Sequence, residues 1–210
     1  MIIAIDGPAA AGKGTLARKL ADHYGLPYLD TGTLYRAVAR TVLDAGESPQ
    51  NEAAACRAAQ TLDAGSLDDP RLREDETGKA ASVVSAYPGV RRALLEFQRS
   101  FAHAPEGAVL DGRDIGTVIA PDADIKFFVT ASPEVRALRR QLEYRGRGLD
   151  VPLEQVLEDV RRRDERDATR AEAPLKAAPD ALVVDTSELN AEEVFKAAVQ
   201  RIERLRGCHG

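Results

Sequence analysis

A glycine-rich segment near the N-terminus constrains this chain more than any other feature. Residues 7–13 read Gly-Pro-Ala-Ala-Ala-Gly-Lys, the pattern G-x-x-x-x-G-K. The segment follows an apolar run at 2–5, which predicts a buried strand, and precedes a helix predicted from about 12 to 24. Glycines let such a loop turn its N–H groups toward an anion, and the helix N-terminus adds partial positive charge. We therefore expect a strand, a phosphate-binding loop and a helix in direct succession.

The end of this loop departs from the usual pattern. Ser or Thr normally follows the Lys, and its hydroxyl ligates magnesium. Here Gly14 follows Lys13 and Thr15 comes next, so we expect Mg²⁺ to rely more on phosphate oxygens and water. Lys13 is placed to reach the outer phosphates of a nucleoside triphosphate, and Thr15 an inner one. The residues expected to bind ATP are Gly7, Pro8, Ala9, Ala10, Ala11, Gly12, Lys13, Gly14 and Thr15.

Strands and helices alternate along the rest of the chain. Apolar runs predict strands at 26–29, 108–110, 125–129 and 181–184, and helices are predicted at 32–43, 90–101, 133–144, 152–166 and 191–206. Nearly continuous apolar strands alternating with helices indicate an α/β fold with three layers, in which helices cover both faces of a parallel, about five-stranded sheet. Ligands of such sheets lie beyond the carboxyl ends of the strands. Polar residues at 6, 30–31 and 111–114 fall at those ends, which predicts one shared cleft.

The charge balance narrows the classes of ligand. The chain has 29 Lys and Arg against 34 Asp and Glu, a net charge of -5, and Arg supplies 23 of its basic residues. This argues against binding of nucleic acid or a membrane by bulk charge, and Arg suits two-pronged capture of phosphates or carboxylates. Neither the two cysteines, Cys56 and Cys208, nor the three histidines, His23, His103 and His209, have the spacing of a disulfide framework or a metal site. Without an apolar run of about 18 residues, we expect a soluble, cytoplasmic protein of one domain.

Three further motifs follow the loop in order. Residues 30–36 read Asp-Thr-Gly-Thr-Leu-Tyr-Arg, residues 111–117 read Asp-Gly-Arg-Asp-Ile-Gly-Thr, and residues 163–170 read Arg-Asp-Glu-Arg-Asp-Ala-Thr-Arg, followed by Ala-Pro-Leu at 173–175. Together with the Gly-Lys-Gly-Thr end of the loop, Ser82 and Arg91, they resemble the bacterial cytidylate kinases across essentially the whole chain. These are nucleoside monophosphate kinases of the P-loop kinase fold. The resemblance implies transfer of the γ-phosphoryl group of ATP to CMP or dCMP, with Mg²⁺ as cofactor.

The resemblance also implies roles for individual residues. Arg36, Arg113 and Arg170 should surround the acceptor phosphate and form the catalytic group together with Lys13. Cytosine presents an exocyclic amine, which an Asp can accept from, and the resemblance assigns base recognition to Ser82, Arg91 and Asp114. Thr31 should lie at the acceptor nucleotide, and Arg163 and Asp167 at its ribose or phosphate. The lid arginines are expected to be Arg136, Arg139 and Arg140, on the helix that leads to an expected lid hinge at 145–148. Closure of the lid should bring some of them over the transferring group.

Some of these residues allow a second interpretation. Asp30 can serve only to cap the helix that follows it. Asp111 can either support the metal from the end of its strand or hold the backbone of its own loop. The run 161–170 can be a solvated helix face. We favour that for residues 161, 162 and 165, whereas Arg163, Asp167 and Arg170 have the spacing of one helical face.

The single domain divides by this resemblance into three parts. The core covers about 1–40, 88–143 and 164–210, the acceptor lobe (which binds the monophosphate) about 41–87, and the lid about 144–163. Many relatives carry a β-rich insertion in the acceptor lobe, where this chain has only the turn and helix of about Asp63 to Lys79. The short lobe bears on how completely the acceptor is enclosed and how strictly cytosine is preferred over uracil. It offers no dedicated interface, so a monomer is expected.

Two other functions are compatible with a phosphate-binding loop. One is a P-loop kinase for another nucleotide or a small alcohol such as shikimate. An alcohol kinase would benefit from a general base and would need fewer arginines, whereas a phosphate acceptor is already ionised. The other is a nucleotide-binding regulatory switch, which would hydrolyse its nucleotide slowly and show no preference among acceptors.

Overall fold

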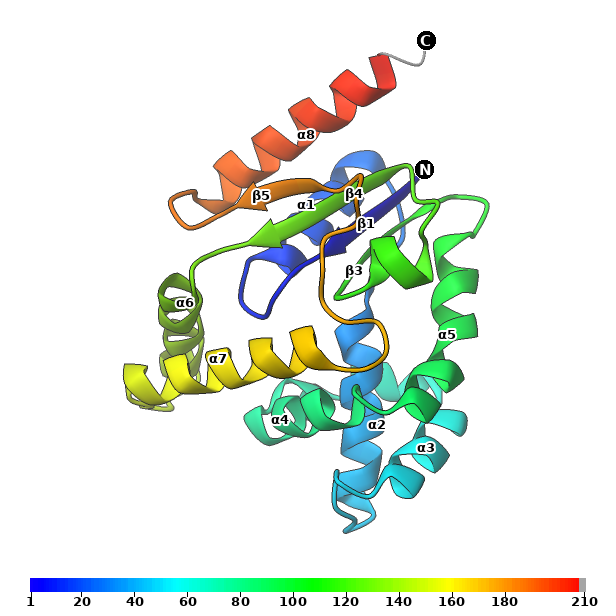
Figure 1. Cartoon of the computed structure of the whole chain (residues 1–210), viewed down its shortest axis with the longest axis vertical. Coiled ribbons are helices and arrows are strands. Elements are labelled where there is room, and N and C mark those ends of the chain that lie inside the picture. Colours follow the sequence, from blue (N-terminus) through cyan, green and yellow to red (C-terminus); the bar gives the residue numbers. More distant parts are fainter. Residues whose placement is uncertain (208–210) are drawn as a thin grey trace.

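A computed structural model describes residues 1–207 as a three-layer α/β fold around one parallel sheet (Figure 1); Cys208 and His209 lie outside the described residues. The strands are β1 (Ile2–Asp6), β2 (Tyr28–Asp30), β3 (Ala108–Gly112), β4 (Ile125–Thr130) and β5 (Leu182–Asp185), in the order β2-β3-β1-β4-β5. Each of the five strands expected from an apolar run is present, and all neighbouring pairs are parallel.

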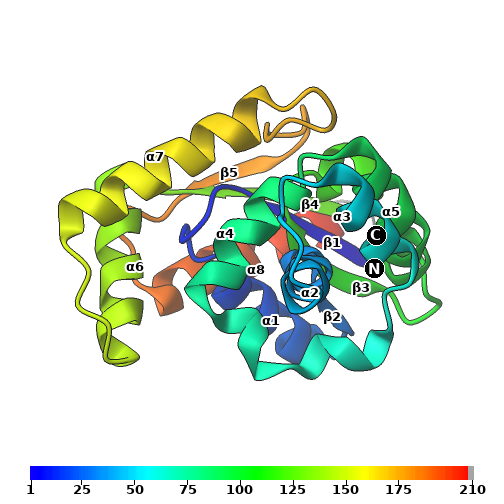
Figure 2. The ribbon, with the colours of Figure 1, turned by 90° about the horizontal axis from the view of Figure 1, so that it is seen from below.

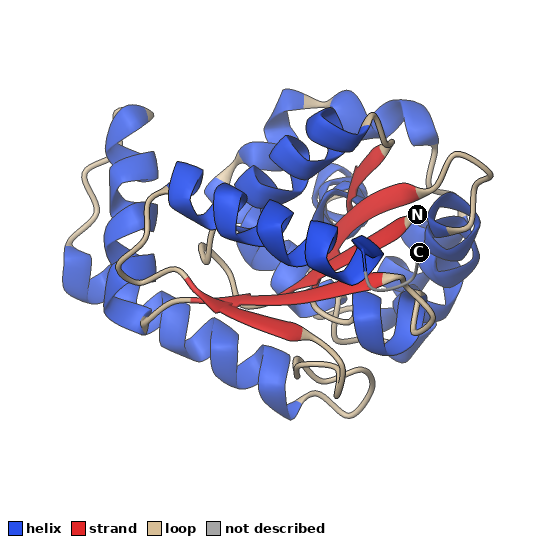
Figure 3. Ribbon diagram, turned by 90° about the horizontal axis from the view of Figure 1, so that it is seen from above, coloured by secondary structure: helices blue, strands red, loops and turns tan. Residues whose placement is uncertain are grey.

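Helices cover both faces of this sheet, as the alternating pattern predicts (Figure 3). Successive residues of β1 point to opposite faces: Ile3 and Ile5 pack with α1 (Lys13–Tyr24) and α8 (Ala191–Gly207), while Ala4 faces α2 (Thr31–Asp44) and α5 (Pro88–Ala102). All three β1 residues are fully buried. The two apolar clusters hold the strand ends, and the loops that follow them, in fixed places.

The segment expected to form the acceptor lobe, about 41–87, extends from the end of α2. It contains α3 (Glu52–Gln60), the short 3-10 turns η1 (Ala64–Asp68) and η2 (Pro70–Arg73), and α4 (Asp75–Val84). Alanines at 54, 55, 58 and 59 are buried on α3, and their small side chains let this helix pack closely on α2 and α5. The stretch from 63 to 79 is turn and helix without a strand, as expected.

Two helices lie beyond the carboxyl ends of β1 and β4, namely α6 (Pro133–Gly146) and α7 (Leu153–Thr169) (Figures 1 and 2). They share a small apolar core of their own, made by Ala137, Tyr144, Val156 and Val160. α6 continues two residues beyond its expected end at 144. The helix does not extend to Gly148, which has φ 76°. Among residues 1–207, no helix is both long and apolar enough to span a membrane.

Candidate active site

The glycine-rich loop has a backbone that few other residues could adopt. Gly7 has φ 146°, and a Cβ there would lie 1.9 Å from the carbonyl oxygen of Val129, so glycine permits the loop to lie directly against β4. Gly12 has φ 92° immediately before α1. Lys13 is buried and its Nζ donates to the carbonyl oxygen of Pro8 at 2.9 Å. The loop is thus already folded around its lysine.

Lys13 lies in an environment that disfavours its own charge. Burial, reinforced by the nearby charge of Arg113, lowers the pKa of Lys13 to about 7, although Asp111 and Asp30 act in the opposite direction. Within residues 1–207, Lys13 forms no ion pair with a carboxylate. An anion bound in the loop would remove this penalty.

The residues expected to read the base form one cluster across the cleft from Lys13. Arg91 and Asp114 form a buried ion pair, and Arg91 Nη1 also donates to the carbonyl oxygen of Ser85 at 3.2 Å. Arg170 Nη2 lies 3.6 Å from Asp114 Oδ1. The hydroxyl of Ser82 lines the same space, is buried and has no hydrogen-bond partner among residues 1–207. This cluster offers an unsatisfied hydroxyl and a carboxylate held in one orientation.

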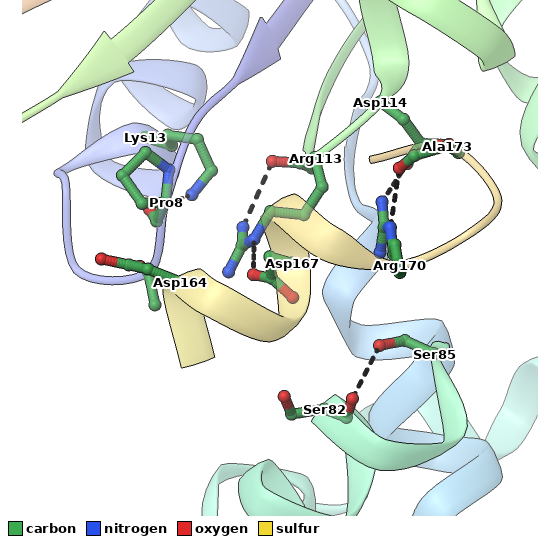
Figure 4. A network of polar contacts seen from close by, with 12 residues as sticks. Pro8, Lys13, Ser82, Ser85, Arg113, Asp114, Asp164, Asp167, Arg170 and Ala173 are labelled. Atoms are coloured by element: carbon green, nitrogen blue, oxygen red, sulfur yellow. Dashed lines mark hydrogen bonds and ion pairs between the residues drawn. The ribbon is translucent and has the colours of Figure 1, made fainter. Parts of the chain in front are cut away.

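Arg113 lies between Lys13 and this cluster (Figure 4), and Arg36 and Arg163 line the same cleft. Arg113 Nε donates to Asp167 on α7 at 2.8 Å. Arg163 forms no ion pair within the described chain and its buried Nε has no partner, so burial and the charge of Arg113 lower its pKa to about 9. Arg36 reaches only Asp30, at 3.8 Å. Because these cations outnumber their close partners, their common space favours an anion.

The structure corrects the placement of one of these arginines. α7 ends at Thr169, and Arg170 follows it with an extended backbone, φ -60° and ψ 143°. Arg170 therefore does not share a helical face with Arg163 and Asp167. Its side chain still enters the cleft, because the chain turns sharply at Ala173, whose carbonyl oxygen accepts from Arg170 Nε at 2.6 Å. The helix predicted at 152–166 already ended before Arg170, so the spacing of the three residues did not justify placing Arg170 on its face.

The sequence left two roles open for Asp30 and for Asp111, and the structure shows what each carboxylate contacts. Asp30 caps α2, since its Oδ1 accepts from the backbone N–H of Gly32 at 2.9 Å. The carboxylate of Asp111 does not hold its own loop; it accepts from the hydroxyl of Tyr28 at 2.8 Å. Thr31 lies against the same strand end and donates to the carbonyl oxygen of Asp111 at 2.9 Å.

The three expected lid arginines are engaged in different ways. Arg136 pairs with Asp164 through two bonds of 2.9 and 2.6 Å, and Arg139 donates to Thr186 at 2.9 and 2.6 Å. Neither lines the cleft in this conformation. Arg140 does line it, and its guanidinium lies 4.9 Å from the ring centre of Tyr144. Their approach to a transferring group stays a prediction.

Apart from Arg136 and Arg139, the groups described above open onto one cleft. Its volume is about 2030 Å³, and the phosphate loop, the acceptor lobe, the segment after β3 and α7 all contribute to its walls. A single small ligand usually occupies a pocket of roughly 300–1000 Å³. The cleft therefore has room for two nucleotides side by side.

Comparison with known proteins now decides the family. The family model described as Cytidylate kinase matches residues 3–204. This chain belongs to the cytidylate kinase family. A cytidylate kinase of Methylobacterium is 64% identical over 203 residues (97% of either chain), and one of Rhodopseudomonas palustris is 59% identical over 206 residues, covering 98% of this chain and 97% of the relative.

Solved structures support the fold independently. An uncharacterised protein from Eubacterium ventriosum matches 97% of this chain and 98% of its own with a TM-score of 0.58 at 20% identity. At that identity the match concerns only the fold. The α/β fold expected from the strand pattern is thereby confirmed, with a five-stranded parallel sheet covered by helices on both faces.

The residues beside the end of the loop fit a magnesium ion whose ligands come mainly from the substrate phosphates and water. Asp111 is buried, and burial together with the charge of Asp30 raises its pKa to about 6. A Cβ at Gly14 would lie 3.6 Å from the Tyr28 hydroxyl and 3.7 Å from Asp111 Oδ2, so Asp111 lies beside the position where other loops carry Ser or Thr. Residues 1–207 contain no group of three or more His, Cys, Asp or Glu placed to hold a metal. One carboxylate with phosphate oxygens and waters is the donor set that Mg²⁺ commonly uses.

The sequence analysis assigned no role to two residues of the site, Tyr28 and Asp6. Tyr28 fixes Asp111 from β2, and nothing in its local pattern distinguishes it from an ordinary strand tyrosine. Asp6 stood out only as a polar residue at a strand end. In the structure both its carboxylate oxygens accept hydrogen bonds from the segment after β3.

Proposed function

We propose that this cytidylate kinase family member transfers the γ-phosphoryl group of ATP to CMP or dCMP, giving ADP and CDP or dCDP. One observation carries the proposal: a folded phosphate loop and a cluster of under-compensated guanidinium groups face the same cleft, with a buried Asp and a free Ser hydroxyl beyond them. A triphosphate suits the first group, a monophosphate the second, and an aminopyrimidine the third.

On the donor side, residues 7–15 would bind ATP through loop N–H groups, with Lys13 at the outer phosphates. Magnesium would be held by phosphate oxygens and water, with Asp111 as its protein partner. Bound there, the metal supplies charge neutralisation on the outer phosphates. The hydrogen bond from Tyr28 keeps the Asp111 carboxylate oriented toward this place.

On the acceptor side, the phosphate of CMP would lie among Arg36, Arg113, Arg163 and Arg170. A monophosphate is close to a dianion at neutral pH, and guanidinium forks match its oxygens. Thr31 and Asp167 border the same space and would contact the nucleotide.

Base selectivity would come from Asp114. Its carboxylate can accept from the cytosine amine, whereas uracil presents a carbonyl oxygen at the same position and would be repelled. The ion pair with Arg91 holds Asp114 in that orientation, and the free hydroxyl of Ser82 adds a second contact. An unmatched polar group in a buried site costs considerable binding energy.

Transfer itself needs no general base, because the attacking oxygen belongs to an ionised phosphate. Positioning and charge neutralisation then supply most of the acceleration. We propose that the lid, about 144–163, and the acceptor lobe, about 41–87, close on the core to exclude water, with Arg140 nearest the cleft and Arg136 and Arg139 following on closure. A monomer is sufficient for all of these roles.

A coupled assay of ADP formation with CMP, dCMP, UMP, AMP and shikimate tests the proposal. We expect turnover to be fastest with CMP or dCMP. A preference for shikimate would identify an alcohol kinase instead. Slow hydrolysis that no acceptor accelerates would identify a nucleotide-dependent switch.

A further inference from the structure

Asp6, the last residue of β1, is a buried carboxylate with an unusual set of partners. Its Oδ1 accepts from the N–H of Ile115 at 2.8 Å and its Oδ2 from the N–H of Gly116 at 2.8 Å. It is 3% exposed, and in residues 1–207 no Lys, Arg or His forms an ion pair with it. Burial raises its pKa to about 6 although both N–H groups lower it. Burying a carboxylate without a cationic partner is unfavourable. The role of Asp6 therefore lies in the backbone segment that its two hydrogen bonds hold in place.

What Asp6 holds is the far end of a two-residue segment. In the sheet, Asp6 lies opposite Gly112, the last residue of β3. The next regular element, the π-helical turn η3 (Ile115–Ile119), begins with the two N–H groups that Asp6 binds. Only Arg113 and Asp114 lie between these points. Asp6 and the strand pairing therefore fix both ends of this segment.

The near end of the segment is equally tight. A Cβ at Gly112 would lie 2.6 Å from Thr31 Oγ1 and 2.8 Å from Ile115 Cδ1, so only glycine fits there. With both ends restrained, Arg113 and Asp114 have little freedom to shift. Their side chains leave in two directions, Arg113 toward Asp167 and Asp114 toward Arg91.

We propose that Asp6 is a positioning residue for the acceptor nucleotide, setting Arg113 and Asp114 from the strand that also carries the phosphate loop. The inference deepens the proposed function and rests on it. Because Gly7 follows Asp6 directly, one strand end places both the donor-binding loop and the acceptor-reading segment. The two substrates are thereby aligned with each other.

This role requires a side chain that has two acceptor oxygens and the length of Asp. Asn keeps the size but has one acceptor, and its amide NH₂ would face one of the two backbone N–H groups. Asp6→Asn therefore loses one bond and pushes the segment away. Glu keeps both oxygens but is longer by one methylene in a packed place. A displacement of about 1 Å at a reacting group can cost roughly 100-fold in rate.

The test is the ratio of kcat/KM for CMP to that for UMP, with Kd for ATP and for CMP measured separately. We expect Asp6→Asn to lower kcat/KM for CMP by at least about tenfold, to lower the CMP:UMP ratio, and to leave the affinity for ATP unchanged. Both substrates are measured on one preparation. Any unfolded fraction then cancels from the ratio, so a purely structural role would not change it.

Asp124→Asn is the matched control. Asp124 accepts from the N–H of Ile2 at 2.7 Å, the same kind of contact on the same strand, but at the end of β1 away from the cleft. We expect this variant to keep the wild-type ratio. Asp6→Glu, measured with saturating ATP, replaces Asp6→Asn if that variant does not fold, with the same expected loss of selectivity.

An unchanged CMP:UMP ratio in the folded Asp6 variant overturns the inference, and so does an equal loss of affinity for ATP and CMP. Wild-type protein that does not phosphorylate CMP overturns the proposed function as well. The two failures are therefore distinguishable.

Discussion

Lys13 is held inside the glycine-rich loop by the carbonyl oxygen of Pro8, and no carboxylate in the described part of the chain forms an ion pair with it. We expect Lys13→Ala to lower kcat by at least about 100-fold, because charge developing on the transferred group loses its closest cation. Steady-state kinetics at saturating ATP and CMP measure this. Lys19→Ala is the control, since Lys19 lies on the same helix but pairs with Glu192 on the outer surface. A similar loss in the control would contradict the assignment.

The depressed pKa of Lys13 makes a second prediction. With a pKa of about 7 in the free protein, Lys13 is largely neutral at pH 8, whereas bound polyphosphate favours the charged form. Binding of Mg-ATP at pH 8 should then take up as much as about one proton per site. Calorimetry in buffers of different ionisation enthalpy measures this uptake. At pH 6 Lys13 is already charged, so the uptake should disappear and proton release from Asp111, whose pKa is about 6, should remain. The uptake at pH 8 should be absent in Lys13→Met.

Asp114 is the residue on which we propose that base selectivity depends. We expect Asp114→Ala to raise KM for CMP by about tenfold or more, with a smaller effect on kcat, because an acceptor for the amine is lost. Arg91 would lose its partner as well, which adds to the effect. Kinetics with CMP and UMP measure it. An unchanged preference for CMP would remove Asp114 from base recognition.

At the scale of elements, α4 of the acceptor lobe contacts the end of α6. The hydroxyl of Tyr144 donates to the carboxylate of Asp75, and Arg140 lies 3.6 Å from the same carboxylate. Lys79 pairs with Asp75 as well and lies 3.7 Å from Asp159 on α7. These contacts close one side of the cleft. The segment 41–87 is thus joined to α6 and α7 although it carries no β-rich insertion.

Removing the central hydrogen bond should loosen this closure. We expect Tyr144→Phe to raise KM for CMP by about two- to tenfold and to increase hydrolysis of ATP in the absence of CMP, since water enters an incompletely closed site. Tyr24→Phe is the matched control, because its hydroxyl donates to Glu203 on the opposite side of the protein at 2.8 Å. If both variants behave alike, the α4–α6 contact does not restrict water.

At the scale of the whole molecule, the free energy of unfolding depends on pH, because the pKa values of several buried groups in and beside the cleft are shifted. Lys13 binds its proton less tightly when folded, so the unfolded chain holds more protons between about pH 7 and 10.5, and stability rises with pH there. Asp6 and Asp111 have raised pKa values of about 6, so the folded chain holds more protons between about pH 3.8 and 6, and stability falls as pH rises through that range.

This linkage predicts that Lys13→Met stabilises the empty protein. At about 1.4 kcal/mol per pKa unit, the gain should amount to a few kcal/mol near pH 7 and shrink as the pH approaches 10. Urea unfolding at several pH values measures it. If the variant is less stable than the wild type at pH 7, Lys13 is not held in an unfavourable environment.

The sequence by itself determined the five strands, the helices around them and the loop at residues 7–13. Those features depend on neighbours in the chain: apolar runs such as 125–129 make buried strands, and glycines at 7 and 12 make the loop turn. The four motifs likewise indicated which side chains belong to the site, and the placement of Arg163 and Asp167 on α7 followed from their spacing.

The tertiary structure alone decided how these residues are held. Asp6 binds N–H groups 109 and 110 residues away, Tyr28 reaches Asp111 across 83 residues, and Tyr144 meets Asp75 across 69. Local spacing contains no information about such contacts, because they arise only when strands pair and helices pack. For the same reason the turn at Ala173, which brings Arg170 into the cleft after α7 has ended, was not predicted from the sequence.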